Sequence, residues 1–277
     1  MEDDHLSTPD VGDWSEEKYR LVAYYAKMFA TSMKRKWDCR VYIDLFAGAG
    51  HAKVKGTPII IRASPLLAIG IPDKFDKYIF CEREPEHLDA LKRRAHQLDP
   101  TLDPSFIPGD VNSNVDDVLS AVPKPRGRFR VLSFCFVDPF GLRNLRFNTI
   151  RRLASKFIDF LVLIPSFMDA NRNLKLYLEE SDTTVEDFLG LHDWRSQWRT
   201  AESNGIEFPR FFAEAFAHQM EKLDYINPGL EWMRLVRSTE RNLPLSHLAF
   251  FSRHERGVEF WKEAMKYSKD QLDLPIE

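Results

Sequence analysis

The chain has 277 residues, a formal net charge of −3 and 44% hydrophobic residues, a composition typical of a globular protein. That length suits one large α/β domain, or a core with a substantial insert. No run approaches the roughly 18 apolar residues that span a bilayer, and the acidic, polar start is the opposite of a signal peptide. We therefore expect a cytoplasmic protein with no membrane contact.

The three cysteines, Cys39, Cys81 and Cys135, are too few and too scattered for a disulfide framework or a zinc site. Cys81 and Cys135 lie inside apolar, strand-like runs, which predicts buried, reduced thiols. We expect no metal ion.

Charge is distributed unevenly along the chain. Residues 1–17 hold seven acids, and we expect residues 1–12 to be a disordered acidic tail before a single domain, residues 13–277. Residues 124–156 hold nine basic residues and one acid, Asp138. This stretch is either a solvated face or a positive rim for an anionic substrate such as a nucleic acid.

After an expected amphipathic helix over residues 14–34, the first informative stretch is Val41–Gly50, VYIDLFAGAG. Its apolar start predicts a short buried strand that ends at Asp44. Gly48 and Gly50 then allow a sharp turn and let a ligand lie against the backbone. The alternative is a plain structural turn. The phrase resembles motif I of Rossmann-like S-adenosylmethionine (SAM) methyltransferases, which implies that Asp44, Phe46, Gly48 and Gly50 bind this cofactor.

Residues 51–63 separate the glycine loop from a helix that Ser64-Pro65 is expected to open, with Ser64 as its N-cap. In most Rossmann-like folds the glycine loop runs directly into the helix that faces the ligand. The insert weakens any role of that helix and could form a flap over the site.

Two further strands are expected to end in acids. Lys77–Glu82 places Glu82 where a carboxylate can accept hydrogen bonds from ribose hydroxyls. The alternative is that Glu82 pairs with Arg83 or Arg94 on the surface. Residues 106–110 read as an edge strand, after which Asp110 can accept a bond from an adenine amino group and Val111 can contact the ring. Asp110 could instead cap a helix over residues 113–121.

The most strand-like stretch, Arg130–Val137, leads into Asp138-Pro139-Phe140-Gly141. Methyltransferases that act on exocyclic amino groups carry Asp/Asn-Pro-Pro-Tyr/Phe at this place, where the acid holds the amino group and the ring stacks on the base. The second proline is missing here, and the form is closer to that of some tRNA guanine N2-methyltransferases. The resemblance implies catalytic roles for Asp138, Pro139 and Phe140, with Arg143 and Arg146 on phosphate. A turn in which Asp138 accepts backbone amides is the alternative.

A further strand is expected over residues 159–164, then an aromatic-rich helical insert over residues 167–225. Residues 233–237 and 247–252 suit a terminal antiparallel hairpin. The expected fold is therefore α/β: a Rossmann-like methyltransferase three-layer sandwich with a mostly parallel sheet closed by that C-terminal hairpin.

Taken in order, DLFAGAG, FCERE, PGD and VDPFG resemble the three-Cys-motif partner protein family (TcmP). This resemblance implies the methyltransferase fold and a partner protein that carries the three-cysteine motif, but identifies no substrate. We expect a SAM-dependent N-methyltransferase that acts on an exocyclic amino group of a nucleic-acid base. The alternative is a non-catalytic or auxiliary SAM-binding module that docks on its three-cysteine, radical-SAM-like partner.

Overall fold

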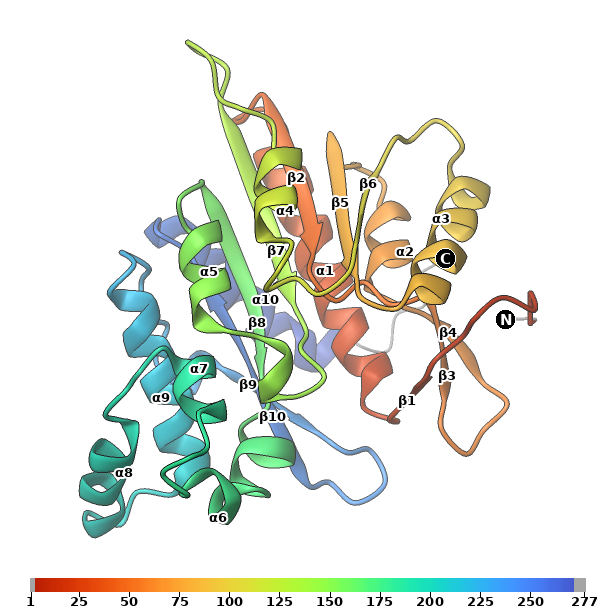
Figure 1. Ribbon diagram of the computed structural model, residues 1–277. Coiled ribbons are helices and arrows are strands. Elements are labelled where there is room, and N and C mark those ends of the chain that lie inside the picture. The colour runs from red at the N-terminus through yellow and green to blue at the C-terminus, as the bar shows by residue number, and fades with distance from the viewer. Residues whose placement is uncertain (1–2, 272–277) are drawn as a thin grey trace.

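A computed structural model describes residues 3–271, and the fold is α/β (Figure 1). Residues 1–2 of the expected tail and 272–277 of the expected domain lie outside the described residues. The main sheet of this part of the chain has the strand order β6-β5-β2-β7-β8-β10-β9. Its strands are Cys39–Asp44 (β2), Lys77–Glu82 (β5), Ser105–Pro108 (β6), Val131–Val137 (β7), Ile158–Ile164 (β8), Arg234–Arg237 (β9) and Pro244–Phe251 (β10).

The topology of the sheet is that of the Rossmann-like methyltransferases, as predicted. β2 is central, β5 and β6 follow on one side, and the chain then crosses to β7 and β8 on the other. Strands β6, β5, β2, β7 and β8 are parallel, whereas β10 runs antiparallel to both β8 and β9. Ligands of such sheets bind outside the carboxyl ends of the strands, where the strand order reverses, here between β2 and β7.

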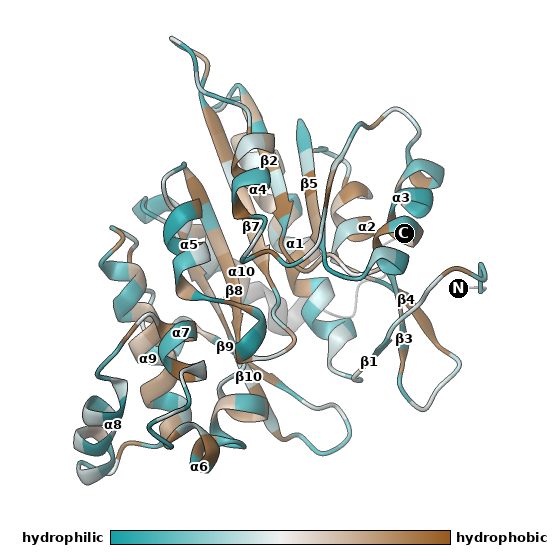
Figure 2. Ribbon diagram, in the orientation of Figure 1, coloured by the Kyte–Doolittle hydropathy of each residue, from teal (hydrophilic) through white to brown (hydrophobic). Residues whose placement is uncertain are grey.

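Both faces of the sheet are covered, because the central strands are apolar on both sides. Alternate residues of β2 show this, since Tyr42 faces one core and Val41 and Ile43 face the other. The first core is closed by Ser15–Met33 (α1), Ser64–Ile69 (α2), Pro85–Leu98 (α3) and Glu255–Gln271 (α10). The second core includes Val115–Ala121 (α4) and Phe147–Leu153 (α5). Figure 2 shows the apolar strands between these more polar outer helices.

The helices between β8 and β9 extend the second core. They are the π-helical turn Ser166–Asn171 (η2), Leu174–Tyr177 (α6), Thr184–Leu189 (α7), Trp194–Ser203 (α8), Phe208–Glu221 (α9) and the 3-10 turn Leu230–Trp232 (η3). Their aromatic residues are mainly core: Phe188, Phe212 and Phe216 are fully buried, and the Phe188 ring packs against the other two. Phe216 also contacts Phe147 of α5, so this helical insert shares one hydrophobic core with the sheet.

Residues 51–63 form a hairpin rather than an irregular flap. His51–Val54 (β3) pairs antiparallel with Ile60–Arg62 (β4), and the Ala63 amide donates to the Gly50 carbonyl at 2.8 Å. The hairpin therefore returns the chain to the glycine loop, and α2 begins beside Gly50. Ser64 is the first helical residue, with Ala63 at the N-cap, and its side chain bonds elsewhere.

Residues 3–12 differ from the expected disordered tail. Asp10–Val11 (β1) adds to β3 as a parallel strand, so a small second sheet has the order β1-β3-β4. Asp4 of this segment pairs with Arg94, which lies 90 residues further along the chain and which the sequence pattern did not indicate as its partner. Among the described residues, no helix combines the length and apolar character that a bilayer crossing requires.

Candidate functional site

Strand-end residues from β2, β5, β6 and β7 gather along the carboxyl edge of the sheet, as predicted. Backbone bonds fix the loops that follow: the Leu45 amide donates to Phe136, the Ala47 amide to Cys81 and the Gly109 amide to Glu82. Each predicted residue below therefore belongs to one connected set of loops, although the residues differ in how far they face solvent.

Asp44 ends β2 as a fully buried carboxylate. It accepts hydrogen bonds from the Ser64 hydroxyl at 2.7 Å, the Phe46 amide at 3.2 Å and the Tyr42 hydroxyl at 3.3 Å. Burial raises the pKa of Asp44 to about 7, although the bonds from Ser64 and Phe46 oppose the shift. Asp44 thus links the glycine loop to the start of α2, with Phe46 half-buried against the core.

Gly48 and Glu82 come together across neighbouring strands. The Gly48 amide donates to Glu82 Oε2 at 2.7 Å, and the Glu84 amide donates to Glu82 Oε1 at 2.9 Å. Neither surface pairing considered for Glu82 occurs, because Arg83 bonds to Glu84 and Arg94 to Asp4. His87 Nδ1 lies 3.7 Å from Glu82 Oε1 and lines an open hollow with Glu84, Pro85 and Glu86.

The two glycines of the loop have different surroundings. Gly48 has a φ of +61°, and no atom lies within 4 Å of where its Cβ would be, so its backbone faces open space. Gly50 has a φ of +81°, but a Cβ there would meet Leu91 at 3.0 Å and Leu66 at 3.1 Å. Gly48 therefore leaves room for a ligand against the backbone, whereas Gly50 allows close packing of α2 and α3.

Asp110 follows β6, as predicted, and is half-buried. Its Oδ1 accepts the Asn112 amide at 2.8 Å, which forms a local turn before α4. Asn114 is the N-cap of α4, without a side-chain cap bond, so the Asp110 side chain does not cap that helix directly. Val111 is buried in the second core, beneath the turn.

Asp138, which follows β7, forms an ion pair that the sequence analysis missed. Lys18 Nζ of α1 lies 2.5 Å from Asp138 Oδ2, and both side chains are nearly buried. Burial lowers the pKa of Lys18, but attraction to Asp138, Tyr19 and Asp44 outweighs this effect, so the pKa is raised. Asp138 Oδ1 has no hydrogen-bond partner among the described residues, so one carboxylate oxygen remains available.

The Asp138–Gly141 turn is supported from the helical insert. Asp169 of η2 accepts the Leu142 amide at 2.7 Å through Oδ2, while its Oδ1 accepts Asn173 Nδ2 at 2.7 Å and the Tyr177 hydroxyl at 2.6 Å. Pro139 is buried, whereas the Phe140 side chain is 89% exposed. An aromatic ring held in water beside a strand-end acid is an available stacking platform.

The basic residues of 124–156, read from the sequence as either a solvated face or a positive rim for an anionic substrate, do not form one continuous rim. Lys124–Arg130 lies at the amino edge of the sheet, before β7, whereas Arg143 and Arg146 follow β7 at the carboxyl edge. Arg143 is exposed and lies 3.5 Å from Asp182; Arg146 is exposed, and its backbone amide donates to Asn112. Only Arg143 and Arg146 are therefore near the candidate site.

Arg94 has partners that the sequence analysis did not predict. Its guanidinium is buried, bonds to both oxygens of Asp4 at 2.6 and 2.7 Å, and donates to the Ala49 carbonyl at 2.7 Å. The bond from Arg94 is the main reason that the pKa of Asp4 falls to about 2. The N-terminal segment is thereby tied to the glycine loop.

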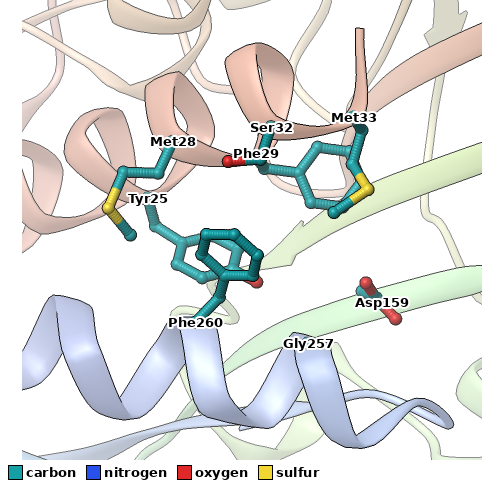
Figure 3. A pocket seen from close by; sticks show the side chains of 8 residues that line it. All are labelled: Tyr25, Met28, Phe29, Ser32, Met33, Asp159, Gly257 and Phe260. Carbon is teal, nitrogen blue, oxygen red and sulfur yellow. The ribbon is translucent and has the colours of Figure 1, made fainter. Parts of the chain in front are cut away.

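A small cavity lies away from this edge. Tyr25 and Phe29 of α1 line it together with Phe260 of α10 (Figure 3). Its volume is about 10 Å³, the room of a single water molecule. Asp159, near the amino end of β8, adjoins the cavity, and burial raises its pKa to about 7. The cavity is too small for a cofactor.

No protein-family model matches the chain and no curated protein does, so the TcmP resemblance stays a prediction. Several solved structures are similar. Protein LPL1258 from Legionella pneumophila is 12% identical over 92% of this chain and 91% of its own, with a TM-score of 0.45. An O-methyltransferase from Bacillus cereus in complex with S-adenosylhomocysteine is 9% identical, covering 87% and 91%, at 0.41. Trm1 from Pyrococcus horikoshii, with SAM, is 10% identical, covering 87% and 57%, also at 0.41.

Proposed function

We propose that the protein is a SAM-dependent N-methyltransferase that acts on an exocyclic amino group of a nucleic-acid base. The observation that carries this proposal is the neighbourhood of β5, β2 and β7 at their carboxyl ends. There the open backbone of Gly48 bonds to Glu82. One strand away, Asp138 lies beside the exposed ring of Phe140.

The chain offers suitable groups for the cofactor. Gly48 leaves the space that a Cβ would fill, and Glu82 is a strand-end acceptor for ribose hydroxyls. Asp110 supplies an acceptor at the next strand for an adenine amino group. When bound, SAM supplies an electrophilic methyl group.

The residues after β7 would hold the methyl acceptor. The free Oδ1 of Asp138 would accept a hydrogen bond from the substrate amino group, which would direct the nitrogen lone pair toward the methyl group of bound SAM. Lys18 keeps the other oxygen in place, and Phe140 stacks on the base. A target within a duplex must first be flipped out of the stack. Arg143 and Arg146 are exposed cations suited to a substrate phosphate.

The first test is calorimetric titration of the purified protein with SAM and S-adenosylhomocysteine, using Gly48→Val. The new side chain would enter the open space that the Gly48 backbone faces, so we expect binding to be lost. Gly56→Val is the matched control, because Gly56 has a φ of +79° and is equally open, but lies in the β3–β4 turn. Wild-type protein that binds neither compound, or equal binding by both variants, would reject the cofactor site.

The second test follows a radiolabelled methyl group from SAM onto DNA, tRNA and protein. Asp138→Ala removes the oxygen assigned to the acceptor amino group, so it should abolish transfer while SAM affinity stays within about twofold, because Asp138 is assigned to the acceptor and not to the cofactor. Unchanged turnover in this variant would remove Asp138 from the mechanism.

A second candidate function is an auxiliary SAM-binding module that docks on a three-cysteine, radical-SAM-like partner, as the TcmP resemblance implies. The ion pair between Lys18 and Asp138 favours it, because one oxygen of the presumed catalytic acid is already engaged. Co-purification with such a partner, together with SAM binding and no methyl transfer to any polymer, would support this function over the first.

A further inference from the structure

A second basic surface lies at the amino edge of the sheet, opposite the candidate site. Strands β2, β7 and β8 are parallel neighbours, so the segments that precede them meet along one edge. These segments are residues 34–38, 123–130 and 155–157, here called the amino-edge surface. In Figure 1 they lie at the upper end of these strands, whereas the candidate site lies at the lower end.

Backbone bonds hold the three segments together. The Asp38 amide donates to the Arg130 carbonyl at 3.2 Å, and the Ser133 amide donates to the Phe157 carbonyl at 2.9 Å. Arg126 and Phe129 pair across a tight turn in which Gly127 adopts a φ of +57°. The surface is therefore built on the sheet and on a hairpin turn that projects from it.

The charge of the amino-edge surface is strongly positive. Its only acid is Asp38, and its basic residues are Lys34, Arg35, Lys36, Lys124, Arg126, Arg128, Arg130 and Lys156. Lys34 pairs with Asp73, and Arg130 lies 3.6 Å from Asp38. Within the described part of the chain, Arg126 and Arg128 form no ion pair, and both are exposed. Such a surface attracts a polyanion.

Exposed aromatic rings lie among these charges. Phe157 is 62% exposed and Phe129 is 42% exposed. The Phe157 ring lies 6.1 Å from the half-buried Trp37 ring, and the Arg130 guanidinium lies 5.7 Å from Trp37. Solvated basic faces have no need of exposed rings, whereas unpaired bases stack on them and duplex bases do not.

We infer that the amino-edge surface binds single-stranded nucleic acid, with phosphates on the arginines and bases stacked on Phe129 and Phe157. This binding site is distinct from the methyl-transfer site. A long polymer would be held at the amino edge of the sheet while another part of the same polymer reaches the methyl-transfer site at the carboxyl edge. The purpose of the amino-edge surface rests on the proposed nucleic-acid substrate, but its binding requires neither SAM nor Asp138.

The test measures fluorescence anisotropy of a labelled 12-nucleotide oligo(U) with the full chain and no SAM, at several salt concentrations. Arg126→Glu with Arg128→Glu should weaken binding at least tenfold and reduce the salt slope by at least about 1.4, the value for two phosphate contacts. Arg93→Glu with Arg199→Glu is the charge-matched control, since both residues are exposed on outer helices. This control variant should keep the oligo(U) affinity of the wild type and the same dependence of that affinity on salt.

Phe129→Ala with Phe157→Ala tests stacking separately. It should weaken binding about fivefold or more at every salt concentration and leave the salt slope unchanged, because no charge is removed. The same series in an Asp138→Ala background separates the two proposals, since nucleic-acid binding should persist where methyl transfer is lost.

Three results would overturn the inference: no oligo(U) binding by the wild type, an equal loss in the Arg93/Arg199 control, or tighter binding of a labelled duplex. A labelled polyglutamate peptide of equal charge is the last comparison. Equal affinity for that peptide would assign the surface to an acidic protein partner instead.

Discussion

Lys18 Nζ lies 2.5 Å from Asp138 Oδ2, so a lysine from the first helix neutralises the acid that follows strand β7. The two side chains are 7% and 12% exposed, and each would be costly to leave unpaired. The pair joins α1 to the proposed acceptor loop and leaves only one Asp138 oxygen for a substrate.

Replacing one member of this pair should therefore cost more than replacing both. Lys18→Met leaves the Asp138 charge without its partner and should lower the free energy of unfolding by about 3 kcal/mol or more. The double variant Lys18→Met, Asp138→Asn should recover most of that loss. Urea denaturation of the wild type, both single variants and the double variant gives the coupling energy. Additive effects would contradict the structural pair.

The pH dependence of stability should report on Asp44. Its pKa is about 7 in the folded chain, above the ordinary value of 3.8, so the folded state binds the proton more tightly. Protonation of Asp44 therefore contributes to the free energy of unfolding, and this contribution is fully present below pH 4 and is lost as pH rises through 7. Relative to Asp44→Asn, which cannot ionise, the wild type should lose about 1.4 kcal/mol per pH unit between about pH 5 and 7.

Ser64→Ala extends the same experiment. The Ser64 hydroxyl holds down the pKa of Asp44, so its removal should raise that pKa further and carry the loss of stability to higher pH. Denaturant titrations from pH 5 to 9 measure the free energy of unfolding of the wild type, Asp44→Asn and Ser64→Ala. Parallel curves for wild type and Asp44→Asn would show that Asp44 is ionised in the folded chain.

Arg94 should be needed for the N-terminal segment to remain attached. Arg94→Ala removes the bonds to Asp4 and to the Ala49 carbonyl, and should cost about 3 kcal/mol because the guanidinium is buried. Asp4→Ala should cost less, because Asp4 is partly exposed. Limited proteolysis should cut residues 3–12 faster in both variants, and equal cleavage in the wild type would contradict the attachment.

Phe140 should matter for methyl transfer and not for folding. Its ring is 89% exposed, so Phe140→Ala should leave the melting temperature unchanged. Loss of stacking should lower kcat/KM roughly 5- to 100-fold. Ile59→Ala is the control, since Ile59 is 53% exposed on the β3–β4 hairpin and should leave transfer unchanged. Equal transfer by both variants would remove Phe140 from the acceptor site.

The sequence by itself determined the strands of the parallel sheet and which residues end them. Apolar runs that stop at Asp44, Glu82 and Asp138 specify strand ends locally, and parallel strands bring such ends to one edge. The edge position of β6 and the closing β9–β10 pair followed from equally local features, a proline and a turn. The general location of the candidate site was therefore predictable.

Only the tertiary structure decided the partners of these residues. Helical periodicity places Lys18 on α1 but cannot specify an acid 120 residues away, and nothing local to Arg94 indicates Asp4. The same limit applies to Gly48 and Gly50, which look alike in the sequence. In the structure Gly48 faces open space, whereas Gly50 faces Leu66 and Leu91. The basic residues of 124–156 lie at two opposite edges of the sheet, because β7 runs between them and carries the chain from one edge to the other. Counting charges along the sequence cannot reveal this separation.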